Sequence, residues 1–182
     1  MSDTIGAVIT YAVLLRGVNV GGNNRVPMAD LRACLESLGG IQVSTYLQSG
    51  NAVVTTALSR QDLCRGVADR FGVAVVARTH TELTAVVDAN PFLDAAAAPT
   101  TLHVAFLAGQ PDPERFAALD AETFLPDELR LGDQALYLHY PSGAGRSKLS
   151  AAVLARLGVD ATARNWNTVL ALQRLTAEPA AG

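Results

Sequence analysis

The order of predicted strands and helices constrains this 182-residue chain most, because the same order occurs twice. In the first half, four short segments are apolar or alternate in the manner of strands: Tyr11–Leu15, 42–48, Asn51–Thr55 and Val73–Ala77. Helices with one apolar face are predicted to begin at Pro27 and after Ser59. The resulting order is strand, helix, strand, strand, helix, strand.

The second half repeats this order. Its predicted strands are Leu102–Leu107, Leu129–Leu131, Ala135–Tyr140 and Asp160–Ala163, and its helices begin at Asp112-Pro113 and at Ser147, the latter running to Gly158. The pattern predicts an α+β protein with two tandem ferredoxin-like (βαββαβ) subdomains, a linking helix and a C-terminal helix. We expect the first subdomain at residues 1–78, the linking helix and linker at 79–100, and the second subdomain with the C-terminal helix at 101–182.

Composition limits the classes of function. Hydrophobic residues make up 49% and charged residues 17%, which predicts a folded core. The net charge of −3 disfavours a non-specific nucleic-acid binder. Cys34 and Cys64 have no metal-ligand spacing, and we expect both to be buried in a reducing cytoplasm. With no secretory signal or apolar run of membrane-spanning length, we expect a cytoplasmic protein with no metal, cofactor or membrane partner.

Four polar, glycine-studded stretches stand out: 15–25, 48–51, 142–148 and 163–168. They are rich in hydrogen-bond donors and arginine, and none contains His, Cys, Asp or Glu. Such an inventory suits the binding of an anion better than proton transfer or metal binding. The glycines before Ser147 would leave backbone N–H groups open at a helix start, which favours phosphate or carboxylate.

The predicted topology brings these stretches together in pairs. In the strand order 4-1-3-2, the loop after the first strand and the turn between the second and third lie at one end of the sheet. In the second half, the segments after the third and fourth strands meet at the opposite end. If the subdomains pack with those ends facing, one cleft collects all four stretches.

The candidate ligand-binding residues are the polar, basic and glycine residues of these stretches: Arg16, Asn19, Gly21, Gly22, Asn23, Arg25, Gln48, Ser49, Asn51, Arg146, Ser147, Lys148, Arg164, Asn165 and Asn167. Arginine can bind anionic oxygens with two parallel hydrogen bonds. A structural interpretation stays open, since Gly and Asn are common in turns and Arg16 and Arg164 could simply tie strand ends. Trp166 is expected to be a core anchor rather than a base-stacking platform.

Other chemistries have weaker support. Of the three histidines, only His139 lies near a polar stretch. A Ser49 nucleophile with His139 as its base lacks an aspartate to orient the imidazole, and no nucleophile-elbow pattern is present. An RNA-recognition sheet of this topology would carry aromatic residues on its central strands, and residues 51–55 contain none.

The same stretches resemble a large, mainly bacterial family known as domain of unknown function 1697. The motifs are Leu-Leu-Arg-Gly-Val-Asn-Val-Gly-Gly at 14–22, Gln-Ser-Gly-Asn at 48–51, Ser-Lys-Leu at 147–149 and Ala-Arg-Asn-Trp-Asn-Thr at 163–168. The resemblance spans residues 11–175, and Arg25 keeps the charge at a position where the family often has lysine. It implies two related ferredoxin-like subdomains and no established activity, substrate or cofactor.

Three functions therefore remain open. The first is binding of a phosphorylated or anionic ligand, such as a nucleotide or the end of an oligonucleotide, in a cleft between the subdomains. The second is an enzyme that acts on a phosphoryl or acyl group, with Arg16 and Arg164 stabilising the developing charge. The third is a protein-interaction module in which the motifs are only structural.

Overall fold

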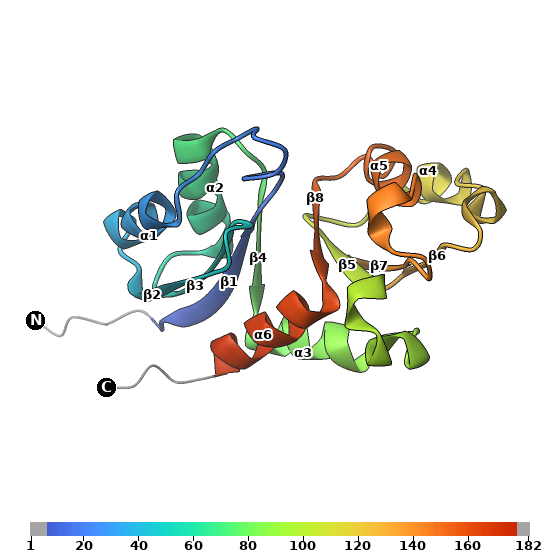
Figure 1. Cartoon of the computed structure of the whole chain (residues 1–182). Helices are drawn as coiled ribbons and strands as arrows, with labels where there is room; N and C mark the ends of the chain where they lie inside the picture. Colours follow the sequence, from blue (N-terminus) through green and yellow to red (C-terminus); the bar gives the residue numbers. More distant parts are fainter. Residues whose placement is uncertain (1–6, 178–182) are drawn as a thin grey trace, which may run out of the picture. The chain divides into compact units, whose positions relative to one another are not determined.

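The computed structural model describes residues 7–177 and contains two four-stranded antiparallel sheets (Figure 1). The first sheet has the order β2-β3-β1-β4 and is built from β1 (Ile9–Leu15), β2 (Ile41–Tyr46), β3 (Asn51–Thr56) and β4 (Val75–Thr79). The second has the order β6-β7-β5-β8 and is built from β5 (Leu102–Leu107), β6 (Glu128–Leu131), β7 (Ala135–His139) and β8 (Ala161–Asn165). The predicted α+β class is confirmed.

Two helices, α1 (Met28–Ser37) and α2 (Arg60–Phe71), cover one face of the first sheet (Figure 1). Helix α2 begins where the Ser59 side chain accepts the Asp62 N–H, and it ends at Gly72, whose φ of +66° is left-handed. The core beneath the helices joins alternate residues of β1 to the inward faces of α1 and α2; its members include Tyr11, Val13, Leu15, Leu31, Leu35, Leu63 and Val67.

The second sheet is associated with two shorter helices, α4 (Pro113–Ala117) and α5 (Leu149–Leu154). Four 3-10 turns complete this part of the chain: η1 (Asp94–Ala97), η2 (Pro99–Thr101), η3 (Ala121–Phe124) and η4 (Ala144–Arg146). The helix predicted from Ser147 to Gly158 is shorter than expected, since α5 ends at Leu154. The apolar spacing behind that prediction still holds, because Leu149, Val153 and Leu157 are all fully buried.

Helices α3 (His80–Asp88) and α6 (Trp166–Ala177) each cross the division between two compact units. Of the described residues, the first unit comprises 7–82 and 172–177, while the second unit is Leu83–Ala171. This differs from the expected boundaries, which assigned the whole C-terminal helix to the second subdomain. In agreement with this division, His80 Nδ1 lies 2.9 Å from the carbonyl oxygen of Gln173.

The strand registers determine which segments lie at the same end of each sheet. Leu14 is opposite Asn51, so the loop after β1 and the turn before β3 share one end of the first sheet. In the second sheet, Leu102 is opposite His139 and His103 is opposite Asn165, so the segments after β7 and β8 also start at one end. Over the described part of the chain, no helix has the length and apolar character needed to cross a membrane.

Candidate functional site

Asn19 fixes the first glycine-rich loop to the β2–β3 turn. Its Nδ2 donates to the carbonyl oxygens of Val26 at 2.9 Å and Gln48 at 2.6 Å, and its Oδ1 accepts the Val26 N–H at 2.9 Å. Its φ of +56° is left-handed, a conformation that asparagine tolerates better than most residues. The two predicted stretches of the first unit therefore meet, and one of the proposed ligand-binding asparagines holds them together.

Asn24 closes the other side of this loop, with Nδ2 donating to the Gly17 carbonyl at 3.2 Å. Gly21 and Gly22 at the tip have φ values of +58° and +80°, and a Cβ on either would meet nothing within 4 Å. Their conformation therefore comes from the turn itself rather than from crowding. Several candidate residues of the first unit are exposed: Arg16, Gly21, Gly22, Asn23, Arg25, Gln48 and Ser49.

Asn51 is fully buried and supports the turn from within. Its Nδ2 donates to the Tyr46 carbonyl at 3.1 Å and to Ser49 Oγ at 2.9 Å. A side chain at Gly50, where φ is +79°, would collide with Val18 of the first loop. The Gln-Ser-Gly-Asn sequence thus makes a compact turn, and its asparagine serves the fold.

The third stretch, residues 142–148, differs from the open anion site that its sequence predicts. Ser147 Oγ accepts the Leu149 N–H at 3.0 Å, but it also donates to Asp127 Oδ2 at 2.6 Å. A carboxylate thus lies where the sequence predicts an anion, and the six-residue α5 offers only a short helix start. Arg146 and Lys148 are exposed on either side of Ser147.

The fourth stretch is largely internal. Arg164 is only 8% exposed, and its Nη1 donates to Thr162 Oγ1 at 2.6 Å and to the Ala163 carbonyl at 2.8 Å. Burial lowers the pKa of Arg164 to about 10. Asn165 Oδ1 accepts the Thr168 N–H at 2.9 Å and so caps α6.

The residues that follow Asn165 separate into core and surface. Trp166 is 4% exposed, in agreement with its expected role as a core anchor, whereas Asn167 is exposed.

Cys34 is buried and Cys64 half-buried, and burial raises the pKa of both thiols, which favours the unreactive form. No cluster of three His, Cys, Asp or Glu side chains that could hold a metal ion occurs among the residues described.

Sequence reasoning missed a second buried arginine, Arg78 of β4, which is 4% exposed. Its Nη1 donates to the Ala77 carbonyl at 2.9 Å, the same contact that Arg164 makes to Ala163. The sequence feature that could have indicated Arg78 is the dipeptide Ala-Arg. It occurs as Ala77-Arg78 shortly before α3 and as Ala163-Arg164 shortly before α6.

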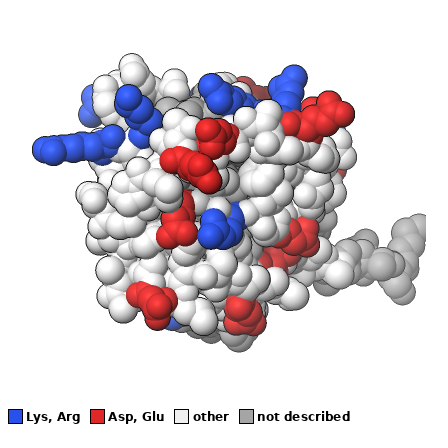
Figure 2. Space-filling model, turned by 90° about the vertical axis from the view of Figure 1, so that its right-hand side faces the viewer, with Lys and Arg blue, Asp and Glu red and all other residues white. Residues whose placement is uncertain are grey.

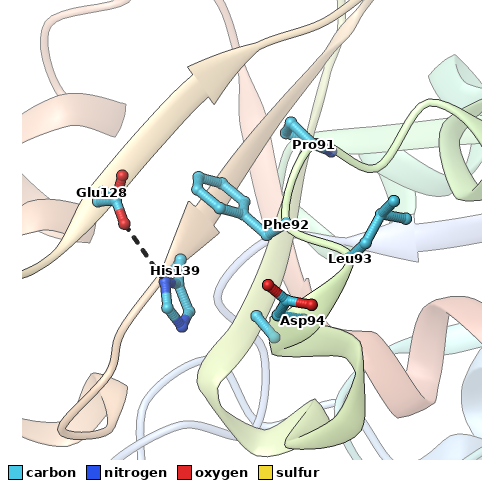
Figure 3. A pocket seen from close by; sticks show the side chains of 7 residues that line it. Pro91, Phe92, Leu93, Asp94, Glu128 and His139 are labelled. Atoms are coloured by element: carbon cyan, nitrogen blue, oxygen red, sulfur yellow. Dashed lines mark ion pairs between the residues drawn. The ribbon is translucent and has the colours of Figure 1, made fainter.

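Sequence reasoning also missed a pocket in the second unit, of which it noted only His139 (Figure 3). The pocket has a volume of about 440 Å³ and is lined by Pro91, Phe92, Leu93, Asp94, Ala95, Glu128 and His139. The segment 91–95 carries no motif, so only the fold brings it to the ends of β6 and β7.

Charged side chains of both signs are interspersed on the face of the molecule in Figure 2, and much of that face is uncharged. This distribution agrees with the net charge of −3 and with the low content of charged residues. The face in this view carries no broad basic surface of the kind that binds nucleic acid non-specifically.

Comparison with known proteins identifies the family. The fold is similar to that of a conserved bacterial protein from Streptococcus pneumoniae, with a TM-score of 0.74 and 24% identity over 93% of this chain and 99% of that one. No curated protein matches the sequence. A family model described as "Protein of unknown function (DUF1697)" matches residues 8–137, which include the first two motifs and end before the last two. The chain therefore belongs to the DUF1697 family of proteins of unknown function.

Proposed function

We propose that this protein binds a phosphorylated or other anionic ligand at the loop–turn surface, by which we mean the exposed residues of loop 16–25 and turn 48–51. One observation carries the proposal. The N–H groups of Gly21 and Gly22 donate to no atom of the described residues, and the exposed Arg25 forms no ion pair with any of them. Backbone N–H groups and an arginine side chain on one exposed loop are donors of the kind that phosphate and carboxylate oxygens accept.

The internal hydrogen bonds of Asn19 and Asn24 support this proposal, because they hold the loop in one conformation before a ligand arrives. A site that is already ordered loses less conformational entropy on binding. The asparagines then act by positioning the loop, while Arg16, Arg25 and the glycine N–H groups make the contacts. A nucleotide or the end of an oligonucleotide offers the required oxygens.

The test is a thermal-shift panel of pyrophosphate, nucleotides and short oligonucleotides on the wild type, Arg25→Ala and Arg32→Ala. Arg32 is an exposed arginine on α1, so its variant changes the net charge equally. A ligand at 100 times its dissociation constant adds about 2.7 kcal/mol to the free energy of unfolding. We expect a shift for one ligand class that is lost in Arg25→Ala and kept in Arg32→Ala. Equal losses in both variants, or no shift for any anion, would overturn the proposal.

We also infer that the two units are tandem ferredoxin-like domains that arose by internal duplication. Both sheets have the strand order fourth-first-third-second, which supports this inference. So does the shared contact of Arg78 and Arg164, each of which donates to the carbonyl of the preceding alanine at the same position in its sheet. A structure-based alignment of the two units that pairs these arginines and their flanking elements would test the inference.

A further inference from the structure

The pocket in the second unit is built on a loop whose conformation Asn90 determines. Asn90 is 6% exposed; its Oδ1 accepts the Phe92 N–H at 2.9 Å and its Nδ2 lies 3.4 Å from the Phe92 carbonyl oxygen. Both contacts fix the backbone of Phe92 and so direct its side chain. The sequence Asn90-Pro91 therefore does more than end α3: it positions an aromatic ring beside β6 and β7.

Phe92 and His139 form an aromatic wall of this pocket (Figure 3). Their ring centroids are 5.3 Å apart and the rings are inclined by 36°. Leu93, which is 75% exposed, points away from His139 in the same view. The Phe92 ring gives an incoming ring or alkyl chain an apolar surface against which to pack, beside the imidazole of His139.

The charged groups that line the pocket are acidic. Glu128 Oε1 lies 3.8 Å from His139 Nδ1, and the Asp94 carboxylate is turned toward the Phe92 and His139 rings (Figure 3). No lysine or arginine is among the lining residues. His139 Nδ1 is itself buried and has no hydrogen-bond partner among the described residues, so a ligand in the pocket does not reach this nitrogen without a movement of the side chain.

The protein already places one cation against these groups from outside the pocket. Arg130 Nη2 lies 3.3 Å from Glu128 Oε2, and Arg130 Cζ lies 5.7 Å from the centre of the Phe92 ring. The same carboxylate and the same ring therefore accept a positive charge, by ion pairing and by a cation–π contact. Glu128 Oε1, which faces His139, is left for a second donor.

We infer that this pocket binds an organic ammonium compound, such as an amine with an aromatic or alkyl body. The apolar body packs against Phe92 and His139, and the ammonium N–H groups donate to Asp94 and Glu128. The cavity of about 440 Å³ is within the range of small-molecule sites. The inference is independent of the anion proposal, because the two sites require ligands of opposite charge and share no residue.

The test uses 2-phenylethylammonium as the probe, with 2-phenylethanol as its uncharged counterpart. Each is titrated to millimolar concentration into the full chain at neutral pH, and binding is followed by two-dimensional amide NMR. We expect the ammonium compound to shift amide resonances of residues 92–95 and of the ends of β6 and β7, and to do so at lower concentration than the alcohol. Equal affinity for both probes, or no shift from the ammonium compound, would overturn the inference.

Matched variants assign the effect to this pocket. Glu128→Gln keeps the shape of the side chain and removes its charge, so it should weaken binding about tenfold, the loss expected for one charge-assisted hydrogen bond. Arg130→Met keeps an apolar stem and removes the competing cation, so it should tighten binding about threefold. Asp94→Asn tests the second carboxylate on an exposed residue, where the fold is least sensitive. Unchanged affinity in both Glu128→Gln and Asp94→Asn would also overturn the inference.

Discussion

The ends of β4 and β8 occupy equivalent positions in the two units and use the same arginine contact. Arg78 lies opposite Ala12 of β1, and Arg164 lies opposite Val104 of β5. Both arginines are buried and donate to the carbonyl oxygen of the preceding residue. Only Arg164 belongs to a recognisable motif. Because Arg78 makes the same contact without that motif, the contact reflects the position of the arginine in the sheet.

The two segments differ in how the following helix begins. Thr79 precedes α3 and Asn165 precedes α6, and in each case the N–H three residues on approaches the capping side chain, at 3.3 Å for Glu82 and 2.9 Å for Thr168. The Thr79 cap adds a carboxylate that returns to the Thr79 N–H, which forms a capping box. Both capping side chains are therefore neutral, and the difference is the Glu82 carboxylate that the start of α3 adds.

The largest expected difference between the two segments is at the first helical residue. Trp166 is 4% exposed and His80 is half-buried. Trp166→Ala should lower the free energy of unfolding by about 4 kcal/mol, the usual cost of removing a buried aromatic side chain, and His80→Ala by about 1 kcal/mol. Urea denaturation measures both, with the exposed Asn167→Ala as the control. Similar losses for Trp166→Ala and His80→Ala would contradict this contrast.

The next largest predicted effect is the loss of stability when either buried arginine is replaced, and this loss should be the same in both units. Arg78→Ala and Arg164→Ala should each lower the free energy of unfolding by about 2 kcal/mol, because each variant removes the charge-assisted hydrogen bonds that the buried guanidinium donates. Denaturant midpoints of the two variants, compared with that of the exposed Arg32→Ala, provide the measurement. A loss confined to Arg164→Ala would show that the two arginines are not equivalent in the fold.

The capping side chains of Thr79 and Asn165 should contribute less to the free energy of unfolding than the buried arginines. Thr79→Ala and Asn165→Ala should each lower the free energy of unfolding by about 1 kcal/mol, since each leaves a helix N–H without its acceptor. Calorimetric melting of the single and double variants would test this prediction. Two caps in separate elements should give additive losses, and strong non-additivity would contradict the view that each acts locally.

The smallest predicted effect is a difference between the two helix starts in how the free energy of unfolding depends on pH. Burial opposes ionisation of Glu82, but the Thr79 N–H and the Arg60 guanidinium hold the pKa of this carboxyl below its usual value of 4.5. A lowered pKa in the folded state contributes stability that is present above pH 4.5 and is lost as the pH falls through the folded-state pKa. Glu82→Gln should therefore flatten the acid side of the stability profile. Asn165→Ala should leave that slope unchanged, and an equal effect from both would contradict the assignment.

Much of the architecture follows from local patterns that are visible in the sequence. Alternation and apolar runs located the strands to within a few residues, and the Ser59 cap and the Asp112-Pro113 start correspond to observed helix N-termini. The shortened α5 and the transfer of the end of α6 to the first unit were not predictable, because they depend on contacts distant in sequence, such as His80 with Gln173.

The candidate site was predicted less well than the fold. Residue type and spacing located the polar stretches, and the predicted strand order correctly indicated that the first loop and the β2–β3 turn meet, as the contact of Asn19 with Gln48 shows. They could not indicate that Asn51 and Arg164 would be buried, or that Asp127 would approach Ser147. They also gave no reason to join Phe92 to Glu128 and His139 in one pocket.

The sequence by itself determined the order of the elements, the apolar faces that form the two cores, and the turns that require glycine or asparagine. These features depend on interactions within a few residues along the chain. Only the tertiary structure decided which polar side chains form hydrogen bonds within the fold and which stay exposed. That division depends on burial and on partners far away in sequence: Arg25 and Arg164 are the same residue type, yet one is exposed and the other is 8% exposed and bonded within its strand.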